Sequence, residues 1–376
     1  MNGDEEKKKK HSQASPIVVD SPYGQGVLSL RSAQVLVTGG AGFIGRWLVD
    51  ALSFYGAEVT VVDDLSTSGD FGKLSSLKNV HTFRESVMNP HFLGRNPRKF
   101  DFVFHLAGVV GMRLAHRQAR RAHFVAEQGT RNVIRATGTA RLIAFSSSSV
   151  YAFSPAIAMS EDAPIVSEEL AKYDAGPIGY ASGKAALERA VHAVSEEGRE
   201  CLILRPFNVV GPGQSRLYGM VLPEFVYAAL RGKPLQVYDD GLQSRSFACV
   251  QTFIQHLIKL VTSPDAYAPK QNVFNLGNPT ESSILSLAHA VLTETRSQSE
   301  IEFVPYASVF PNRIDVRQRK PSISRAESII GKTHWPSVTE VVRSVIHHPQ
   351  SHSDIIDETG RSLLSTQGPI QSPSLV

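Results

Sequence analysis

The chain has 376 residues, 42% hydrophobic and 20% charged, so it can bury one large core or two unequal ones. The formal net charge of +4 comes from basic residues spread along the sequence, which argues against a nucleic-acid partner. The two cysteines, Cys201 and Cys249, lie in apolar stretches, so we expect neither a disulfide framework nor a metal site. Without a long apolar run or a signal-peptide core, the sequence predicts a cytoplasmic protein with no membrane partner.

The two ends of the chain are predicted to be tails. Residues 1–32 are polar and include the run Lys7 to Lys10, which could dock on an anionic surface but is typical of a solvated, disordered segment. Residues 351–376 are rich in Ser, Pro and Gly and read as a flexible tail.

Between the tails, strand-like runs alternate with helical patterns. The strands are "AQVLVTGG", "AEVTVVDD", "FDFVFHLAG" and "ARLIAFSSSS", and the helices include "FIGRWLVDALSFYG" and "GYASGKAALERAVHAVSEEG". This predicts an α/β fold with a doubly wound parallel sheet of the Rossmann type over residues 33–205. A later strand near residues 247–260 is a candidate to join this sheet. Residues 206–350 are expected to form a smaller α/β domain over the carboxyl ends of the strands, where a ligand cleft should lie.

A glycine turn follows the first strand. In "VLVTGGAGFIGRWLV" the glycines Gly39, Gly42 and Gly45 lie between an apolar strand and an amphipathic helix. Glycine lets the backbone approach a pyrophosphate, and the helix offers unpaired N–H groups and the positive end of its dipole. The turn, with Phe43 and Ile44, is therefore predicted to bind a dinucleotide, although a purely structural glycine turn is the alternative.

The second strand ends in "VVDD". Asp63 lies at the distance from the turn at which a carboxylate accepts the hydroxyls of the adenosine ribose, and its charge repels a 2′-phosphate. NAD is therefore the expected cofactor. Asp64 next to it could be a simple strand-end cap.

Tyr180 and Lys184 are the candidate catalytic pair. They are four residues apart on a helix, so they share one face, and the ammonium could lower the pKa of the phenol. Tyr180 is then a plausible general base and acid for a hydroxyl/ketone pair, and a hydroxyl from "AFSSSSVY" could bond the same oxygen. On its own, such a pair is more often an exposed feature of a helix.

Several motifs together resemble the extended short-chain dehydrogenase/reductases, the NAD-dependent epimerase/dehydratase family. The resemblance covers residues 33–348 through "TGGAGFIG", "HLAG", "SSSSVY", "YASGK" and "LRPFNVVGPGQ" in that order. It implies that Ser147 supplies the catalytic hydroxyl and that Leu106, Ala107 and Lys184 contact the cofactor. It also implies that the substrate is a nucleotide sugar, whose sugar binds to Ser147 and Tyr180. The diphosphate of this substrate would then contact Asn208, Arg245 and Arg319. The guanidinium groups of the two arginines suit phosphate oxygens. Family analogy also implies a homodimer through two helices of the NAD domain.

Besides "VYA" in place of the usual "VYG", three positions depart from the family pattern. Ala126 replaces the Asn of the "N-x-x-G-T" helix, Ser86 replaces the acid expected at the adenine, and Thr252 replaces an Asp after the "RSF" strand. These losses leave open a protein that binds NAD and nucleotides without catalysis, although Ser147, Tyr180 and Lys184 are all present.

The reaction is inferred from carboxylates that are missing. The 4,6-dehydratases of the family carry Asp and Glu at the two positions directly after the catalytic hydroxyl residue. UDP-glucuronate decarboxylases tend to have a Glu at the second of these positions. In this sequence the two positions are Ser148 and Ser149, so neither carboxylate is present. Without another acid or base, oxidation of C4 and return of hydride to the opposite face is the simplest outcome. The sequence thus favours a UDP-sugar 4-epimerase, with a decarboxylase or a dehydratase as alternatives.

Overall fold

The computed structural model describes residues 30–347, except 69, 95–98, 110–117, 153, 155–157, 168–176 and 310–316. Most of the two expected tails lies outside these residues. The N-terminal tail was placed too far along the chain, however, because Leu30 is fully buried in the largest core.

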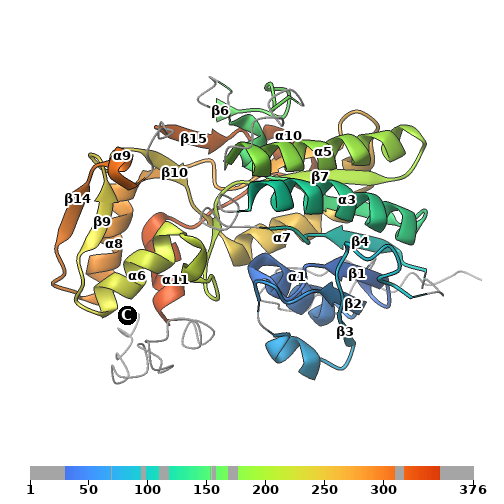
Figure 1. The fold of residues 1–376 in the computed structure, drawn as a ribbon, viewed down its shortest axis with the longest axis horizontal. Helices are drawn as coiled ribbons and strands as arrows, with labels where there is room; N and C mark the ends of the chain where they lie inside the picture. The colour runs from blue at the N-terminus through green and yellow to red at the C-terminus, as the bar shows by residue number, and fades with distance from the viewer. Residues whose placement is uncertain are drawn as a thin grey trace, which may run out of the picture.

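A seven-stranded parallel sheet forms the larger part of the molecule (Figure 1). Its strand order is β12-β7-β5-β4-β1-β2-β3, so the order reverses between β1 and β4. The predicted doubly wound sheet is confirmed, and the loops after β1 and β4 separate at the point where such sheets bind ligands. The strands are β1 (Gln34–Thr38), β2 (Glu58–Asp63), β3 (Val80–Arg84), β4 (Phe102–His105), β5 (Arg141–Phe145), β7 (Cys201–Pro206) and β12 (Val273–Leu276).

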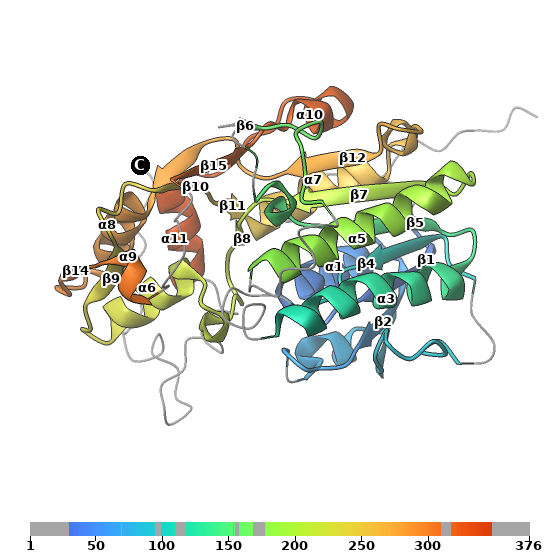
Figure 2. The same ribbon diagram turned by 45° about the horizontal axis from the view of Figure 1, so that its top comes forward.

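Both faces of this sheet are covered by helices. Along β1, Val35 and Val37 belong to one apolar cluster and Leu36 to another, the alternation expected of a strand buried on both sides. Figure 2 shows α3 and α5 in front of the sheet and α1 behind it. The helices are α1 (Phe43–Phe54), α3 (Ala119–Thr137), α5 (Pro177–Glu196), α7 (Val250–Val261) and α10 (Ser324–Ile330), with the short 3-10 helices η2 (Gly72–Ser76), η3 (Ser148–Tyr151) and η5 (Pro264–Tyr267).

The segment expected to return to the sheet as a strand near 247–260 is mostly a helix. Phe253, Ile254, Leu257 and Ile258 recur at helical spacing, so α7 buries one face in the same core as α1. The strand that returns to the sheet is β12, which pairs with β7. The large core therefore continues well beyond residue 205, as the expected return of a later segment implies, but through α7 and β12 rather than through a strand near 247–260.

The smaller lobe has its own apolar core, built mainly from α6, α8 and α11 (Figure 1). A separate four-stranded sheet, β13-β10-β15-β6, includes strands from distant parts of the chain. No helix in the described ranges is long and apolar enough to cross a bilayer. The elements are β6 (Ala158–Met159), β8 (Val209–Val210), η4 (Arg216–Tyr218), α6 (Val221–Leu230), β9 (Leu235–Tyr238), β10 (Ser244–Ser246), β11 (Ala248–Cys249), β13 (Glu281–Ser283), α8 (Ile284–Thr295), β14 (Ile301–Val304), α9 (Tyr306–Val309), β15 (Gln318–Pro321) and α11 (Val338–His347).

Two buried histidines make the fold sensitive to acid. His105 lies between the hydroxyls of Thr38 and Thr130, and burial lowers its pKa to about 3. His256 packs against the ring of Trp335, and burial lowers its pKa to about 4. Each is neutral in the folded protein at a pH where a histidine of the unfolded chain is protonated.

We expect the contribution of these histidines to stability to be complete above about pH 6.5 and to be lost as the pH falls toward their folded pKa values. The free energy of unfolding should decrease by up to about 1.4 kcal/mol per pH unit for each histidine. Urea unfolding between neutral pH and about pH 5 measures this slope. His105→Gln should show a shallower slope than the wild type, and an equal slope would contradict the assignment.

Candidate active site

The three predicted glycines form one tight turn at the switch point of the sheet. Gly39 has a φ of +74°, and a Cβ there would lie 2.6 Å from the backbone nitrogen of Ala107. A Cβ on Gly45 would lie 2.4 Å from the carbonyl oxygen of Gly39, and Gly42 is the N-cap residue of α1. Only glycine fits at positions 39 and 45 without backbone movement, so the start of α1 lies directly against the turn.

Asp63 is placed at the end of β2 beside this turn. Its side chain is 9% exposed, and its carboxylate accepts hydrogen bonds from the backbone N–H groups of Ala41 (3.0 Å) and Leu65 (2.8 Å). Burial raises the pKa of Asp63, although both hydrogen bonds act in the opposite direction. Asp64 instead accepts from the N–H of Ser66 and is exposed, in line with a simple loop cap.

The other predicted cofactor residues border the same turn. Phe43 and Ile44 open α1 and are partly buried against the large core, as is Leu106. Leu106 and Ala107 follow β4 and contact Gly39, as the glycine geometry shows. The structure therefore brings the predicted cofactor residues from three loops to one edge of the sheet.

Ser147 and Tyr180 meet, and Lys184 follows Tyr180 by one turn of α5. Ser147 is the N-cap residue of η3, immediately after β5, and its hydroxyl forms a hydrogen bond with the phenol of Tyr180 on α5. Lys184 is 3% exposed, and its ammonium donates to the carbonyl oxygen of Phe145 at 2.6 Å. Because a Cβ on Gly108 would be 3.6 Å from the Lys184 nitrogen, this trio lies next to the cofactor turn.

The electrostatics of the trio differ from the expectation. The protein around the phenol raises the pKa of Tyr180, while the hydrogen bond with Ser147 acts to lower it. Burial also lowers the pKa of Lys184 to about 8, against the attraction of Glu188. The predicted lowering of the Tyr180 pKa by Lys184 stays a prediction: burial raises this pKa overall, and the ammonium of Lys184 donates to the Phe145 carbonyl.

The residues expected at the diphosphate lie on the smaller side of the molecule. Arg245 on β10 and Arg319 on β15 are direct partners in the parallel pairing of these strands, so their side chains share one face. Asn208 follows β7 with an unusual φ of +36°, and its buried side-chain nitrogen has no partner among the described residues. A buried N–H donor of this kind suits an anionic ligand, because leaving it unpaired is costly.

The positions that depart from the family pattern have structural roles. Ala126 is buried on α3 where Gly183 of α5 approaches it, and the hydroxyl of Ser86 accepts the N–H of Met88 in the turn after β3. Thr252 is partly buried in the first turn of α7. The hydroxyl of Ser149, however, is buried without a partner among the described residues.

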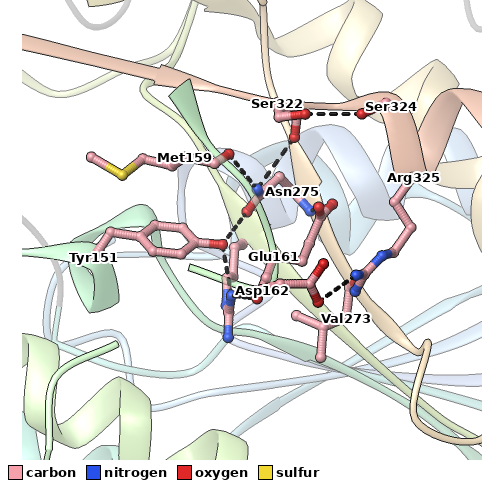
Figure 3. A network of polar contacts seen from close by, with 10 residues as sticks. Tyr151, Met159, Glu161, Asp162, Val273, Asn275, Ser322, Ser324 and Arg325 are labelled. Carbon is pink, nitrogen blue, oxygen red and sulfur yellow. Dashed lines mark hydrogen bonds and ion pairs between the residues drawn. The ribbon is translucent and has the colours of Figure 1, made fainter. Parts of the chain in front are cut away.

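Sequence reasoning missed a buried polar network behind Ser147. The carboxylate of Glu188 accepts from Ser146 (2.5 Å) and from two nitrogens of Arg205 (2.7 and 2.8 Å), and Arg205 also donates to the hydroxyl of Tyr151 at 2.6 Å. Figure 3 shows the next contact, from the Tyr151 hydroxyl to Asn275. The available signal was the spacing of Glu188, one turn after Lys184 on the same helix face.

No group of three or more metal-ligating side chains occurs within the described parts of the chain.

A comparison with protein families matches residues 35–277 to the NAD-dependent epimerase/dehydratase family. The chain belongs to this family. Among its members, UDP-glucuronic acid decarboxylase 1 of Xenopus tropicalis is 30% identical over 331 residues, covering 84% of this chain and 72% of its own. UDP-N-acetyl-alpha-D-glucosaminuronate decarboxylase of Bacillus cytotoxicus is 28% identical, covering 78% and 90%.

Solved structures of the family share the fold. An epimerase from Methanothermobacter thermautotrophicus has a TM-score of 0.75 at 24% identity, covering 84% of this chain and 92% of its own. UDP-N-acetylglucosamine 4-epimerase from Methanobrevibacter ruminantium, in complex with UDP-N-acetylmuramic acid, has a TM-score of 0.70 at 25% identity, covering 84% and 97%.

The cofactor of this family enzyme is NAD, and the site fits it. Glycines at positions 39 and 45 let the backbone of the turn lie against the start of α1, where the helix N-terminus suits a pyrophosphate, and a carboxylate at Asp63 suits the ribose hydroxyls. The preference for NAD over NADP, which follows from the negative charge of Asp63, stays a prediction.

We expect Asp63→Asn to weaken NAD binding about tenfold, because the neutral amide is a poorer acceptor for the ribose hydroxyls and the two backbone N–H groups. Its discrimination against NADP should weaken as well, since the repelling charge is removed. Calorimetric titration with both dinucleotides measures the effect. Asp64→Asn is the matched control and should bind like the wild type; equal losses in the two variants would argue against the role of Asp63.

Proposed function

We propose that the protein oxidises C4 of a UDP-uronate and that decarboxylation of the resulting 4-keto sugar is its main reaction. The observation that carries this proposal is the Ser147–Tyr180 hydrogen bond beside the cofactor turn, with Lys184 on the same helix. The uronate is supported by the two relatives named above, since both names describe decarboxylases of UDP-linked uronates.

Tyr180 and Ser147 perform the proton transfer. The deprotonated phenol accepts the proton of the C4 hydroxyl, and the hydroxyl of Ser147 holds the same oxygen in line. The phenol has to lose its own proton first. Burial raises the pKa of Tyr180 and opposes this loss, whereas the hydrogen bond with Ser147 acts in the opposite direction and favours the active form. Bound NAD supplies the two-electron oxidation of C4 and its later reversal.

Decarboxylation needs no further catalytic carboxylate. A ketone at C4 is β to the C6 carboxylate, so the C5–C6 bond can break with its electron pair moving toward the ketone, releasing carbon dioxide. A proton then adds at C5, and the ketone is reduced. The serines at 148 and 149 are therefore compatible with this reaction.

The second candidate is the 4-epimerisation that the sequence favours. Its support is again the absence of a carboxylate at Ser148 and Ser149, together with the epimerases that share the fold. Ser149 has a buried, unpaired hydroxyl, so nothing at this position compels the carboxylate of a uronate to leave.

Incubation with UDP-glucuronate should release carbon dioxide and one equivalent of a UDP-pentose. NMR detects the UDP-pentose, and trapping of labelled carbon dioxide detects the gas. Tyr180→Phe should lower turnover by about 10² to 10⁴-fold, because the proton-transfer group is lost. If the product were a UDP-uronate epimer and no carbon dioxide were released, the protein would be an epimerase and not a decarboxylase. NAD binding without conversion of any nucleotide sugar would instead support the non-catalytic alternative.

We propose, in addition, a homodimer through the outer faces of α3 and α5. Phe124 on α3 is 57% exposed, and a large apolar side chain in this position is a candidate for an interface. Helix α3 packs against α5, the helix that carries Tyr180. Phe124→Glu should convert the dimer to a monomer in light scattering, since a charge in an apolar interface is costly. Phe54→Glu, at a phenylalanine 45% exposed on α1, is the control and should stay dimeric; two unchanged dimers would place the interface elsewhere.

A further inference from the structure

We infer that the hydrogen bond between Tyr151 and Asn275 is a positioning device, which fixes the catalytic residues relative to the strands that carry the arginine pair. The inference rests on the proposed function, because it concerns how one substrate is held at two ends. Neither residue has an assigned role in the reaction.

On the catalytic side, Tyr151 is the last residue of η3, the short helix that Ser147 caps. Its ring is 1% exposed and packs with Val150, Met159 and Phe207 in a small apolar cluster. Its hydroxyl accepts from Arg205 at 2.6 Å and donates to the side-chain oxygen of Asn275 at 2.8 Å. The ring therefore keeps its packing even without the hydroxyl, and the hydroxyl serves the polar network alone.

Arg205 connects the same hydroxyl to the catalytic helix. Its guanidinium forms a buried fork with Glu188, which is one helical turn beyond Lys184 on α5. Glu188 in turn accepts from Ser146, the neighbour of Ser147. A bidentate pair of this kind has a defined direction, so η3, α5 and the end of β5 are held as one unit.

On the other side, Asn275 belongs to β12 and reaches the smaller sheet. Its amide nitrogen donates to the carbonyl oxygens of Met159 (3.0 Å) and Ser322 (3.3 Å), as Figure 3 shows. Met159 ends β6, which pairs with β15, and Ser322 directly follows β15. Because β15 carries Arg319 and pairs with β10, which carries Arg245, the network ends on the strands of the arginine pair.

The backbone of Asn275 adds a second anchor at the same point. Its N–H donates to the carboxylate of Glu161 at 2.9 Å, and the carbonyl oxygen of Glu161 accepts from Arg205 at 3.0 Å. Figure 3 shows Glu161 between Tyr151 and Arg325, with Asn275 beside it. Arg205 and Asn275 are therefore connected twice, once through the Tyr151 hydroxyl and once through Glu161, and only the connection through Tyr151 also includes the helix that Ser147 caps.

The consequence for catalysis follows from the two ends of the substrate. The arginine pair would hold the diphosphate while Ser147 and Tyr180 act on C4 of the sugar, so an error in the spacing between these groups displaces the reacting atom. A displacement of about 1 Å can reduce the rate of a chemical step by as much as 10²-fold. Affinity for the nucleotide portion alone does not depend on this spacing.

Tyr151→Phe tests the inference, because it removes one hydroxyl and keeps the packed ring. Tyr267→Phe is the matched control, because Tyr267 is also buried and its hydroxyl donates to the carbonyl oxygen of Val261 at 2.7 Å. Its ring contacts Arg141 at the start of β5, whereas Ser147 follows the other end of this strand. We would measure kcat and KM with UDP-glucuronate, the Kd for UDP alone, NAD retention and the thermal midpoint.

We expect Tyr151→Phe to lower kcat by roughly 10- to 100-fold while the Kd for UDP changes less than about threefold. Tyr267→Phe should lose comparable thermal stability and keep the kcat of the wild type. A kcat of Tyr151→Phe equal to that of the control, or a loss of UDP affinity as large as the loss of kcat, overturns the inference.

A double-mutant cycle with Asn275→Ser provides the second measurement. If both residues act through one contact, the double variant should have about the kcat of the slower single variant, whereas multiplied losses would show independent effects and contradict the inference. A wild-type protein that converts no nucleotide sugar overturns the proposed function and this inference with it. An active wild type with an unaffected Tyr151→Phe variant overturns the inference alone.

Discussion

The backbone contact between Gly39 and the segment Leu106–Ala107 is the constraint on which the rest of the site depends. It occurs directly after the paired strands β1 and β4, where their loops begin, and no side chain fits between the two segments. The contact lets α1 start against the turn and brings the loop after β4, with Gly108, within reach of Lys184. The cofactor turn and the catalytic helix are neighbours because two loops of the sheet approach so closely.

A second level of organisation lies behind the reacting groups. The trio of Ser147, Tyr180 and Lys184 has few bonds of its own, and Lys184 is held by a backbone carbonyl. Rigidity comes from Glu188 and Arg205, two buried charges that satisfy each other and the hydroxyls beside them. A buried pair of this kind adds little net stability compared with apolar packing, but it imposes a geometry, which is the property that a two-ended substrate requires.

Local signals predicted much of this molecule, and contacts between distant segments did not appear in them. The glycine turn, Asp63 and the Tyr180–Lys184 spacing are each contained in a few consecutive residues, so pattern and chemistry were enough to find them. The prediction of a strand near 247–260 is wrong for residues 250–261, where Phe253, Ile254, Leu257 and Ile258 carry helical periodicity. The pairing of Arg245 with Arg319, and the network through Tyr151 and Asn275, join residues more than 70 positions apart. The pKa of Tyr180 could not be predicted, because it depends on what surrounds the phenol.

The way the large core is assembled has a consequence for how the chain can acquire its structure. After building the smaller lobe's first elements, the chain comes back to the large core with α7 and β12, leaves again, and returns with Ala326 of α10. During synthesis on a ribosome, the cofactor-binding part therefore cannot be completed until Ala326 has emerged. A fragment ending at residue 205 would expose the edge of β7 and the face that α7 covers, so truncation at the apparent boundary should give an aggregating polypeptide.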